Sequence, residues 1–165
     1  MSVLPILTWP DPRLSKTCDP VEDVSALGGL IDDMFETMYA APGRGLAAPQ
    51  VGVLARLFVM DPTWKEGEKT PFVCINPVVT RSSDVTHTGQ EACLSIPNVS
   101  ADVTRPMDIT LSYTDSDGVR HEDHLTGFSA TCAQHELDHL DGLVIFDRLS
   151  AEDRENLEMT YEAAL

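Results

Sequence analysis

The segment Cys132–Gly142, CAQHELDHLDG, places two histidines four residues apart, with a glutamate directly after the first. On an α-helix, residues four apart lie on one face, so His135 and His139 can bind the same cation. Glu136 is displaced by about 100° around the helix, beside the metal rather than on it. This position suits a general base for a water molecule, and the segment therefore predicts a metal-hydrolase helix.

Two histidines hold a metal incompletely, and the residues leave more than one candidate for a third ligand. The metalloprotease pattern HExxHxxGxxH matches at Gly142 but fails at its decisive position, where Ile145 stands in place of histidine. Glu158 and Glu162 in the C-terminal tail are not excluded by spacing. The tail is one short acidic helix, however, with little to hold it rigidly against the site.

Cysteine is the remaining donor type. Cys132 shares the histidine face, but it lies roughly 7 to 8 Å along the axis from a metal centred between the histidines. A cysteine side chain cannot span that distance and form a bond of about 2.3 Å, so Cys132 is interpreted as a small hydrophobe lining the pocket. Cys18 lies near a turn and Cys74 within an apolar strand, whereas Cys93, in GQEACLSIPN, can approach the helix from outside.

The hydrophobic pattern predicts an α+β fold, with antiparallel β-sheets and a late helix packed against them. Between Arg44 and about Leu125, strand-like stretches are bounded by Pro, Gly, Asp and Ser, and Asp117-Gly118 is a hairpin signal. These stretches are ARLFVMDP, PFVCINPVVT, MDITLSYTD and GVRHEDHLTG.

Helices are predicted on both sides of this region. An apolar stripe predicts one over 25–39, and GFSATCAQHELDHLDG predicts another, with Ser129 as N-cap and Gly142 as its stop. LVIFDRLS is interpreted as a final short strand, and AEDRENLEMTYEAAL as a short, frayed helix.

Composition indicates one domain over residues 1–165. The formal charge of −16 disfavours direct nucleic-acid binding, since the eleven Lys and Arg residues form no run. No apolar run is long enough for a membrane span, and the N-terminus lacks the basic start of a secretory signal. We therefore expect a cytoplasmic protein. Its four cysteines could arithmetically form two disulfides, but we expect free or metal-bound thiols.

Three segments together resemble the peptide deformylase family. GRGLAAPQVG from Gly43 resembles its GxGxAAxQ motif, EACLSIP from Glu91 resembles its EGCLS motif, and QHELDHLDG from Gln134 resembles its HExDH motif. Their order and spacing also match, and the resemblance spans about residues 3–150. It implies antiparallel sheets around a central helix that bears the histidines. It also implies removal of the N-formyl group from the starting methionine of new polypeptides.

The resemblance also implies roles for individual residues. Cys93, His135 and His139 would bind one divalent metal ion, with water as the fourth ligand; Fe(II) is expected in the cell, with Zn(II), Ni(II) or Co(II) able to substitute. Glu136 would be the acid–base, and the Gln50 amide and the Leu94 backbone N–H would hold the developing oxyanion. The substrate-binding positions implied are Gly45, Arg44, Gly89, Phe128, Thr131 and Cys132.

The sequence departs from the family pattern at several positions. Ala92 replaces a frequent glycine, which adds strain if that position needs a positive φ. Gly89 and Thr131 stand where aliphatic residues are frequent near the methionine pocket, and Arg44 stands where Val or Ile is frequent. Ser100 likewise stands where many bacterial members carry arginine. Arg105 is retained, and we expect it to pair with Glu91 or Asp138 and support the metal site.

The C-terminal tail also departs from the family. Between Ser150 and Leu165 it carries five acids and one arginine, so it lacks the basic helix associated with ribosome docking. Any ribosome contact would then be transient and use another route. The expected partner is a formylated nascent peptide, and we expect a monomer.

Two other functions remain open on the sequence. One is a related hydrolase for a different N-formyl or N-acyl compound, which Arg44, Gly89 and Thr131 would accommodate. The other is a non-catalytic relative with a structural metal. Retention of Glu136 and Gln50 argues against that second possibility, because a structural site uses neither.

Overall fold

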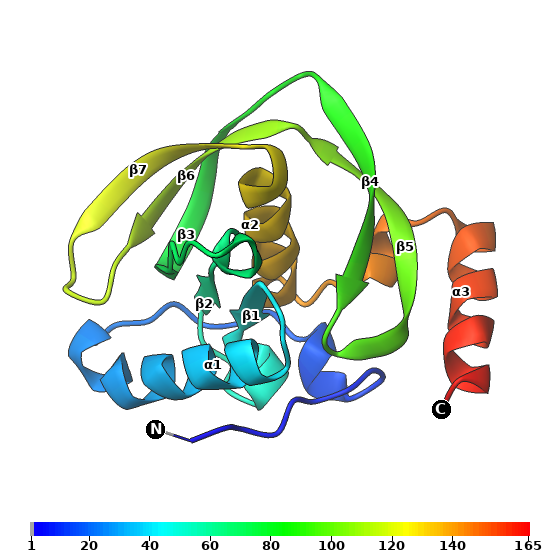
Figure 1. The fold of residues 1–165 in the computed structure, drawn as a ribbon, viewed down its shortest axis with the longest axis horizontal. Coiled ribbons are helices and arrows are strands. Elements are labelled where there is room, and N and C mark those ends of the chain that lie inside the picture. Colours follow the sequence, from blue (N-terminus) through cyan, green and yellow to red (C-terminus); the bar gives the residue numbers. More distant parts are fainter. Residues whose placement is uncertain (1) are drawn as a thin grey trace.

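The protein, described over residues 2–165 by a computed structural model, contains two antiparallel sheets and three α-helices in that part of the chain (Figure 1). The larger sheet has the strand order β1-β2-β3-β6-β7, and the smaller pairs β4 with β5. The strands are β1 Gly45–Ala47, β2 Leu57–Met60, β3 Phe72–Ser82, β4 Thr86–Cys93, β5 Ile96–Pro106, β6 Asp108–Thr114 and β7 Arg120–Thr126. The helices are α1 Gly28–Ala40, α2 Gly127–Leu140 and α3 Ala151–Ala163.

Helix α2 lies between the two sheets (Figure 1). It contacts β1, β2, β6 and β7 of the larger sheet and β5 of the smaller one. The predicted α+β fold with antiparallel sheets around a central helix is therefore confirmed. This position brings side chains from both sheets to one helix face.

The start of α2 differs from the prediction, and its end agrees. Thr126, in extended conformation, is the N-cap, so Ser129 lies inside the first turn and the predicted Ser129 cap is wrong. Gly142 has a φ of 77°, the left-handed conformation that ends a helix, and a Cβ there would lie 2.9 Å from the backbone of Ser15. The last helical carbonyl, of Leu140, accepts from Cys18 N and from Arg56 Nη1.

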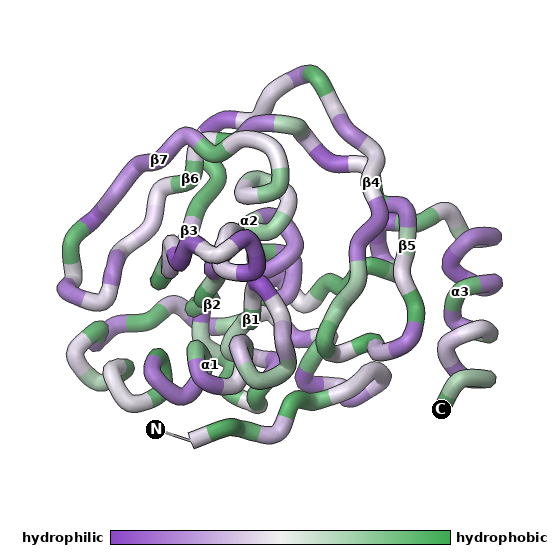
Figure 2. The backbone as a smooth tube through the Cα atoms, in the orientation of Figure 1, coloured by the Kyte–Doolittle hydropathy of each residue, from purple (hydrophilic) through white to green (hydrophobic). Residues whose placement is uncertain are grey.

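Two hydrophobic clusters hold the central helix and the larger sheet together. Ala130, Ala133 and Leu140 of α2 pack with buried side chains of β2, β3 and β6. Helix α1 packs its buried residues, including Met34 and Met38, with those of β1, β2 and β3 in a second cluster. Figure 2 shows β7, at the sheet edge, as mostly hydrophilic, a pattern that disfavours pairing with another strand.

Two further predicted elements differ in the structure. The helix predicted over 25–39 begins at Gly28, after a 3-10 turn over Val24–Leu27. The strand predicted for LVIFDRLS is wrong, because Ile145–Arg148 form a 3-10 helix. Asp147 accepts from Val144 N at 2.8 Å and closes this turn, and the Phe146 ring packs edge-on against Trp9.

The C-terminal tail is more regular than a frayed helix. Helix α3 runs over Ala151–Ala163 and is capped by Ser150 Oγ, which accepts from Asp153 N. Tyr161 is buried and donates to the Trp9 carbonyl at 2.8 Å.

No helix within residues 2–165 is long and apolar enough to cross a membrane. All four cysteines are free thiols.

Candidate functional site

Three side chains from two elements meet at the C-terminal half of α2. The potential ligand atoms of Cys93, His135 and His139 all lie within 4.8 Å of one another. Cys93 ends β4, and its Sγ lies 3.4 Å from His139 Nε2. Two imidazoles and one thiol form a donor set that fits a tetrahedral divalent metal with one open position. Glu158, by contrast, pairs with Arg154 on the outer helix α3.

The orientation of His135 is set by a buried glutamate. His135 Nδ1 lies 3.0 Å from Glu91 Oε1, which leaves Nε2 to face Cys93 and His139. A carboxylate on the far ring nitrogen fixes both the tautomer and the ring direction of a metal-binding histidine. Burial alone would raise the pKa of Glu91, but the hydrogen bonds from His135 and Arg105 outweigh it and lower this pKa to about 2. Glu91 is thus a carboxylate at neutral pH.

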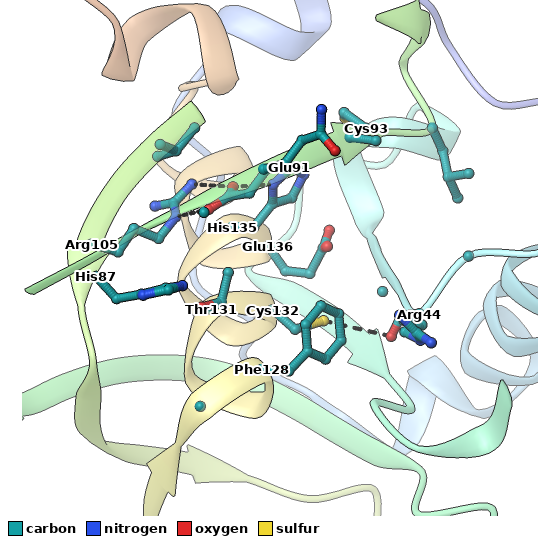
Figure 3. Close-up of a pocket in the computed structure, with 18 of the residues that line it drawn as sticks. Arg44, His87, Glu91, Cys93, Arg105, Phe128, Thr131, Cys132, His135 and Glu136 are labelled. Carbon is teal, nitrogen blue, oxygen red and sulfur yellow. Dashed lines mark hydrogen bonds and ion pairs between the residues drawn. The ribbon is translucent and has the colours of Figure 1, made fainter. Parts of the chain in front are cut away.

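Arg105 in turn holds Glu91 in place through a buried ion pair (Figure 3). Its Nε and Nη2 donate to the two Glu91 oxygens at 2.8 and 3.0 Å, and its Nη1 donates to Asp138 at 2.9 Å. The expected pairing is confirmed, with both carboxylates at once. Arg148 completes the network, since its Nη2 donates to Asp138 Oδ1 at 2.6 Å. Sequence reasoning missed Arg148, which lies in the segment predicted as a strand.

Glu136 lies beside the metal-ligand cluster and faces a cavity that is described below (Figure 3). It is only 5% exposed, and its Oε1 has no hydrogen-bond partner among the described residues. Burial raises the pKa of Glu136 to about 7. A buried carboxyl group with such a pKa can both accept and release a proton near neutral pH.

Gln50 is held by hydrogen bonds on both sides of its amide. Its Oε1 accepts from Ala47 N at 2.9 Å, and its Nε2 donates to Ser95 Oγ at 2.9 Å. The same Nε2 lies 3.7 Å from Cys93 Sγ, a weak acceptor. Ser95 was missed as a positioning residue, although it lies in the EACLS motif. Leu94 occupies the turn between β4 and β5.

These side chains surround a cavity of about 670 Å³. Of the twelve site residues expected from the sequence, eleven line this cavity, and His139 lies beneath it at 1% exposure. The lining expected residues are Arg44, Gly45, Gln50, Gly89, Cys93, Leu94, Phe128, Thr131, Cys132, His135 and Glu136. The sequence prediction did not include His87, which approaches Gly89: its Nε2 lies 3.0 Å from the position of a Cβ on that glycine.

The departure at Ala92 proves mild. Ala92 pairs with Ser100 between β4 and β5, and the only non-glycine residues with positive φ in the described chain are Asn76 and Asn98. Position 92 therefore has no need of glycine. Ser100 Oγ accepts from Gln90 Nε2 at 2.9 Å, so it serves the hairpin rather than the cavity.

The sequence profile of the polypeptide deformylase family matches residues 3–155. The chain belongs to this family. It is 48% identical over 151 residues to the peptide deformylase of Rhizobium meliloti, covering 91% of this chain and 87% of that protein. It is also 48% identical over 155 residues to the peptide deformylase of Zymomonas mobilis, covering 91% and 88%.

Solved structures agree with this assignment. A peptide deformylase from Legionella pneumophila has a TM-score of 0.91 at 38% identity, covering 98% of this chain and 95% of that one. The Ehrlichia chaffeensis enzyme in complex with actinonin has a TM-score of 0.90 at 41% identity, covering 99% and 98%. The chain is thus a metal-dependent hydrolase that removes the N-formyl group from new polypeptides, and the resemblance found in the sequence is confirmed.

Proposed function

We propose that Cys93, His135 and His139 hold one divalent metal ion, and that Glu136, Gln50 and Leu94 carry out deformylation beside it. The observation that carries this proposal is the convergence of one thiol and two imidazoles within 4.8 Å at the end of a cavity. A thiolate with two imidazoles favours Fe(II), Zn(II), Ni(II) or Co(II) over Mg or Ca. We propose Fe(II) in the cell, with the other three able to substitute.

Glu136 is the proton carrier in this proposal. When bound, the cation supplies a Lewis acid and makes water acidic enough to ionise near neutral pH. The Glu136 carboxylate accepts a proton from the attacking water, and later donates it to the departing amine nitrogen. Its raised pKa, near 7, and its unpartnered Oε1 support both transfers.

Gln50 and Leu94 stabilise the charge that develops on the formyl oxygen. One amide hydrogen of Gln50 is used by Ser95, and the other faces only the sulfur of Cys93 at 3.7 Å. This second hydrogen is available to an oxyanion at little energetic loss. The backbone N–H of Leu94 supplies the second donor. Donors fixed before the reaction stabilise a transition state without reorganisation.

The formylated peptide lies along β1 in our proposal. This strand is at the edge of its sheet, and an edge strand can pair with an extended peptide. Gly45, in that strand, lines the cavity. Phe128, Thr131 and Cys132 of α2, together with Gly89 of β4, surround the side chain of the first residue.

We further propose that residues 1–165 form one catalytic domain that acts as a cytoplasmic monomer. The net charge of −16 supports the absence of direct nucleic-acid binding. Helix α3 carries five acids and one arginine, which supports at most a transient ribosome contact by another route.

The test is an anaerobic assay of the Fe(II)-loaded protein with formyl-Met-Ala-Ser and with other formylated amino acids. We expect turnover of the methionyl peptide that disappears in Glu136→Ala while the metal stays bound. Turnover only of other compounds would instead favour a different N-formyl or N-acyl substrate. The small residue Gly89 and the polar Thr131 and His87 in the cavity wall are the observations that keep this second candidate.

A further inference from the structure

The residues that line the cavity include more cations than carboxylates, in an otherwise acidic protein. The only carboxylates among the residues lining it are Glu91 and Glu136, at its inner end. Glu91 is already paired with Arg105. Besides Arg105, the other charged residues in the lining are Arg44 and Lys65, both cations. The chain as a whole carries a formal charge of −16, so this excess of cations is a distinct feature of the cavity.

Arg44 adjoins the strand along which we propose that the peptide lies. It directly precedes Gly45 of β1, and its guanidinium carbon lies 5.0 Å from the centroid of the Phe128 ring. Figure 3 shows Arg44 beside Phe128 and Cys132, away from Cys93. A cation stacked on an aromatic ring keeps its position and its charge.

Arg44 forms an ion pair with Glu66, and this ion pair is weak because Glu66 is largely in solvent. Nη2 of Arg44 donates to Glu66 Oε1 at 2.8 Å, and the side chain of Glu66 is 63% exposed. Exposed ion pairs contribute little free energy, so a substrate carboxylate can replace Glu66. Arginine binds a carboxylate through two parallel N–H groups, which makes this exchange selective.

Lys65 adds a second cation to the wall of the same cavity. Its neighbour Trp64 donates from Nε1 to the Gly43 carbonyl at 2.9 Å, which ties the short 3-10 helix Trp64–Glu66 to the chain just before Arg44. Two cations close to one path attract an acidic peptide and repel a basic one.

Resting on the proposed function, we propose that Arg44 selects formylated peptides that carry Asp or Glu at one of the two positions after the formyl-methionine. Lys65 contributes a weaker attraction of the same sign. This preference concerns the residues after the methionine and is separate from recognition of the methionine side chain.

The experiment compares kcat/KM for formyl-Met-Ala-Ser, formyl-Met-Asp-Ser, formyl-Met-Ala-Asp and formyl-Met-Lys-Ser. We expect at least one aspartyl peptide to exceed the lysyl peptide by roughly fivefold, the size of one partly shielded ion pair. The difference should lie in KM and should shrink at high salt. In Arg44→Met the ratio should fall to near one, whereas Arg81→Met, an exposed cation outside this cavity, should keep it.

Three results would overturn the proposal. These are equal kcat/KM for all four peptides in the wild type, an unchanged preference in Arg44→Met, and a preference lost only in Lys65→Met. If no peptide is deformylated, the proposed function fails, and calorimetric binding of the same peptides to the metal-loaded protein decides this inference. Tighter binding of an aspartyl peptide that depends on Arg44 would support it, and equal binding would overturn it.

Discussion

The carboxylate of Glu136 lies directly against the backbone of Gly45. A Cβ on residue 45 would lie 2.5 Å from Glu136 Oε2 and 2.9 Å from its carboxyl carbon. Real Cβ atoms do not approach other atoms this closely, so only glycine lets α2 and β1 pack with this carboxylate between them. The edge strand that we propose for peptide binding therefore also limits the position of the proposed acid–base.

Gly45→Ala should displace the Glu136 carboxylate and lower kcat by at least about tenfold, because proton transfer requires close positioning. Metal content and the overall fold should be unchanged. Gly29→Ala is the matched control, since nothing lies within 4 Å of a Cβ at that position of α1. That control should keep full activity and gain about 0.5–1 kcal/mol of stability. Steady-state kinetics and thermal unfolding of both variants measure these effects.

Glu136→Gln keeps the shape of the side chain and removes its ability to accept a proton. We expect kcat to fall by about 10²–10⁴-fold, the usual contribution of general acid–base catalysis. Bound metal, measured by elemental analysis, should match the wild type, because Glu136 lies beside the three ligand atoms rather than among them. A variant that turns over formyl-Met-Ala-Ser at the normal rate would exclude Glu136 as the proton carrier.

Much of this fold follows from local sequence patterns. Strands β3 and β6 and the hairpin at Asp117-Gly118 could be predicted because their apolar residues and turn signals are local. The run LVIF could not be assigned in the same way, because a short apolar run is equally compatible with a buried strand and with a buried turn. Its state is decided by Phe146 packing on Trp9, a contact between distant parts of the chain.

The candidate site likewise has some features that the sequence predicts and others that only the structure shows. The spacing of His135, Glu136 and His139 predicts their common helix, and the reach of a side chain argues against Cys132 as a ligand. The clearance between Gly45 and Glu136, and the bond from Arg148 to Asp138, join residues far apart in sequence. No local sequence pattern encodes such contacts, so only the folded structure reveals them.

Arg105→Met should weaken both metal binding and the fold. It would leave Glu91 and Asp138 less compensated, at 7% and 6% exposure. Removing one partner of a buried ion pair costs about 3–5 kcal/mol of folding stability. Loss of the groups that orient a metal-binding histidine lowers metal affinity by about 10–100-fold. Metal titration and denaturant unfolding test this.

Arg148→Met is the matched variant, because Arg148 is 42% exposed and Asp138 would still keep its bond to Arg105. Its effect on both quantities should be clearly smaller. Unchanged metal affinity and stability in Arg105→Met would show that this network does not support the metal centre.

Cys93→Ser should remove the thiolate from the metal centre. In the Co(II)-loaded protein we expect loss of the sulfur-to-metal charge-transfer absorption, together with weaker metal binding, since a hydroxyl is a poorer ligand than a thiolate. Cys132→Ser is the control: Cys132 is equally buried but lies outside the cluster of ligand atoms, so the absorption should remain. Retention of the band in Cys93→Ser would rule out Cys93 as the third ligand.

Tyr161 should anchor helix α3 without taking part in the reaction. It is 2% exposed, packs edge-on against Phe146 and donates to the Trp9 carbonyl at 2.8 Å. Tyr161→Phe removes one hydrogen bond and should cost about 1 kcal/mol, whereas Tyr161→Ala also leaves a cavity and should cost about 3–5 kcal/mol. Glu162→Gln, at the exposed neighbouring position, should cost almost nothing. Denaturant unfolding measures these costs, and equal stability of Tyr161→Ala and the wild type would mean that α3 is not held by this side chain.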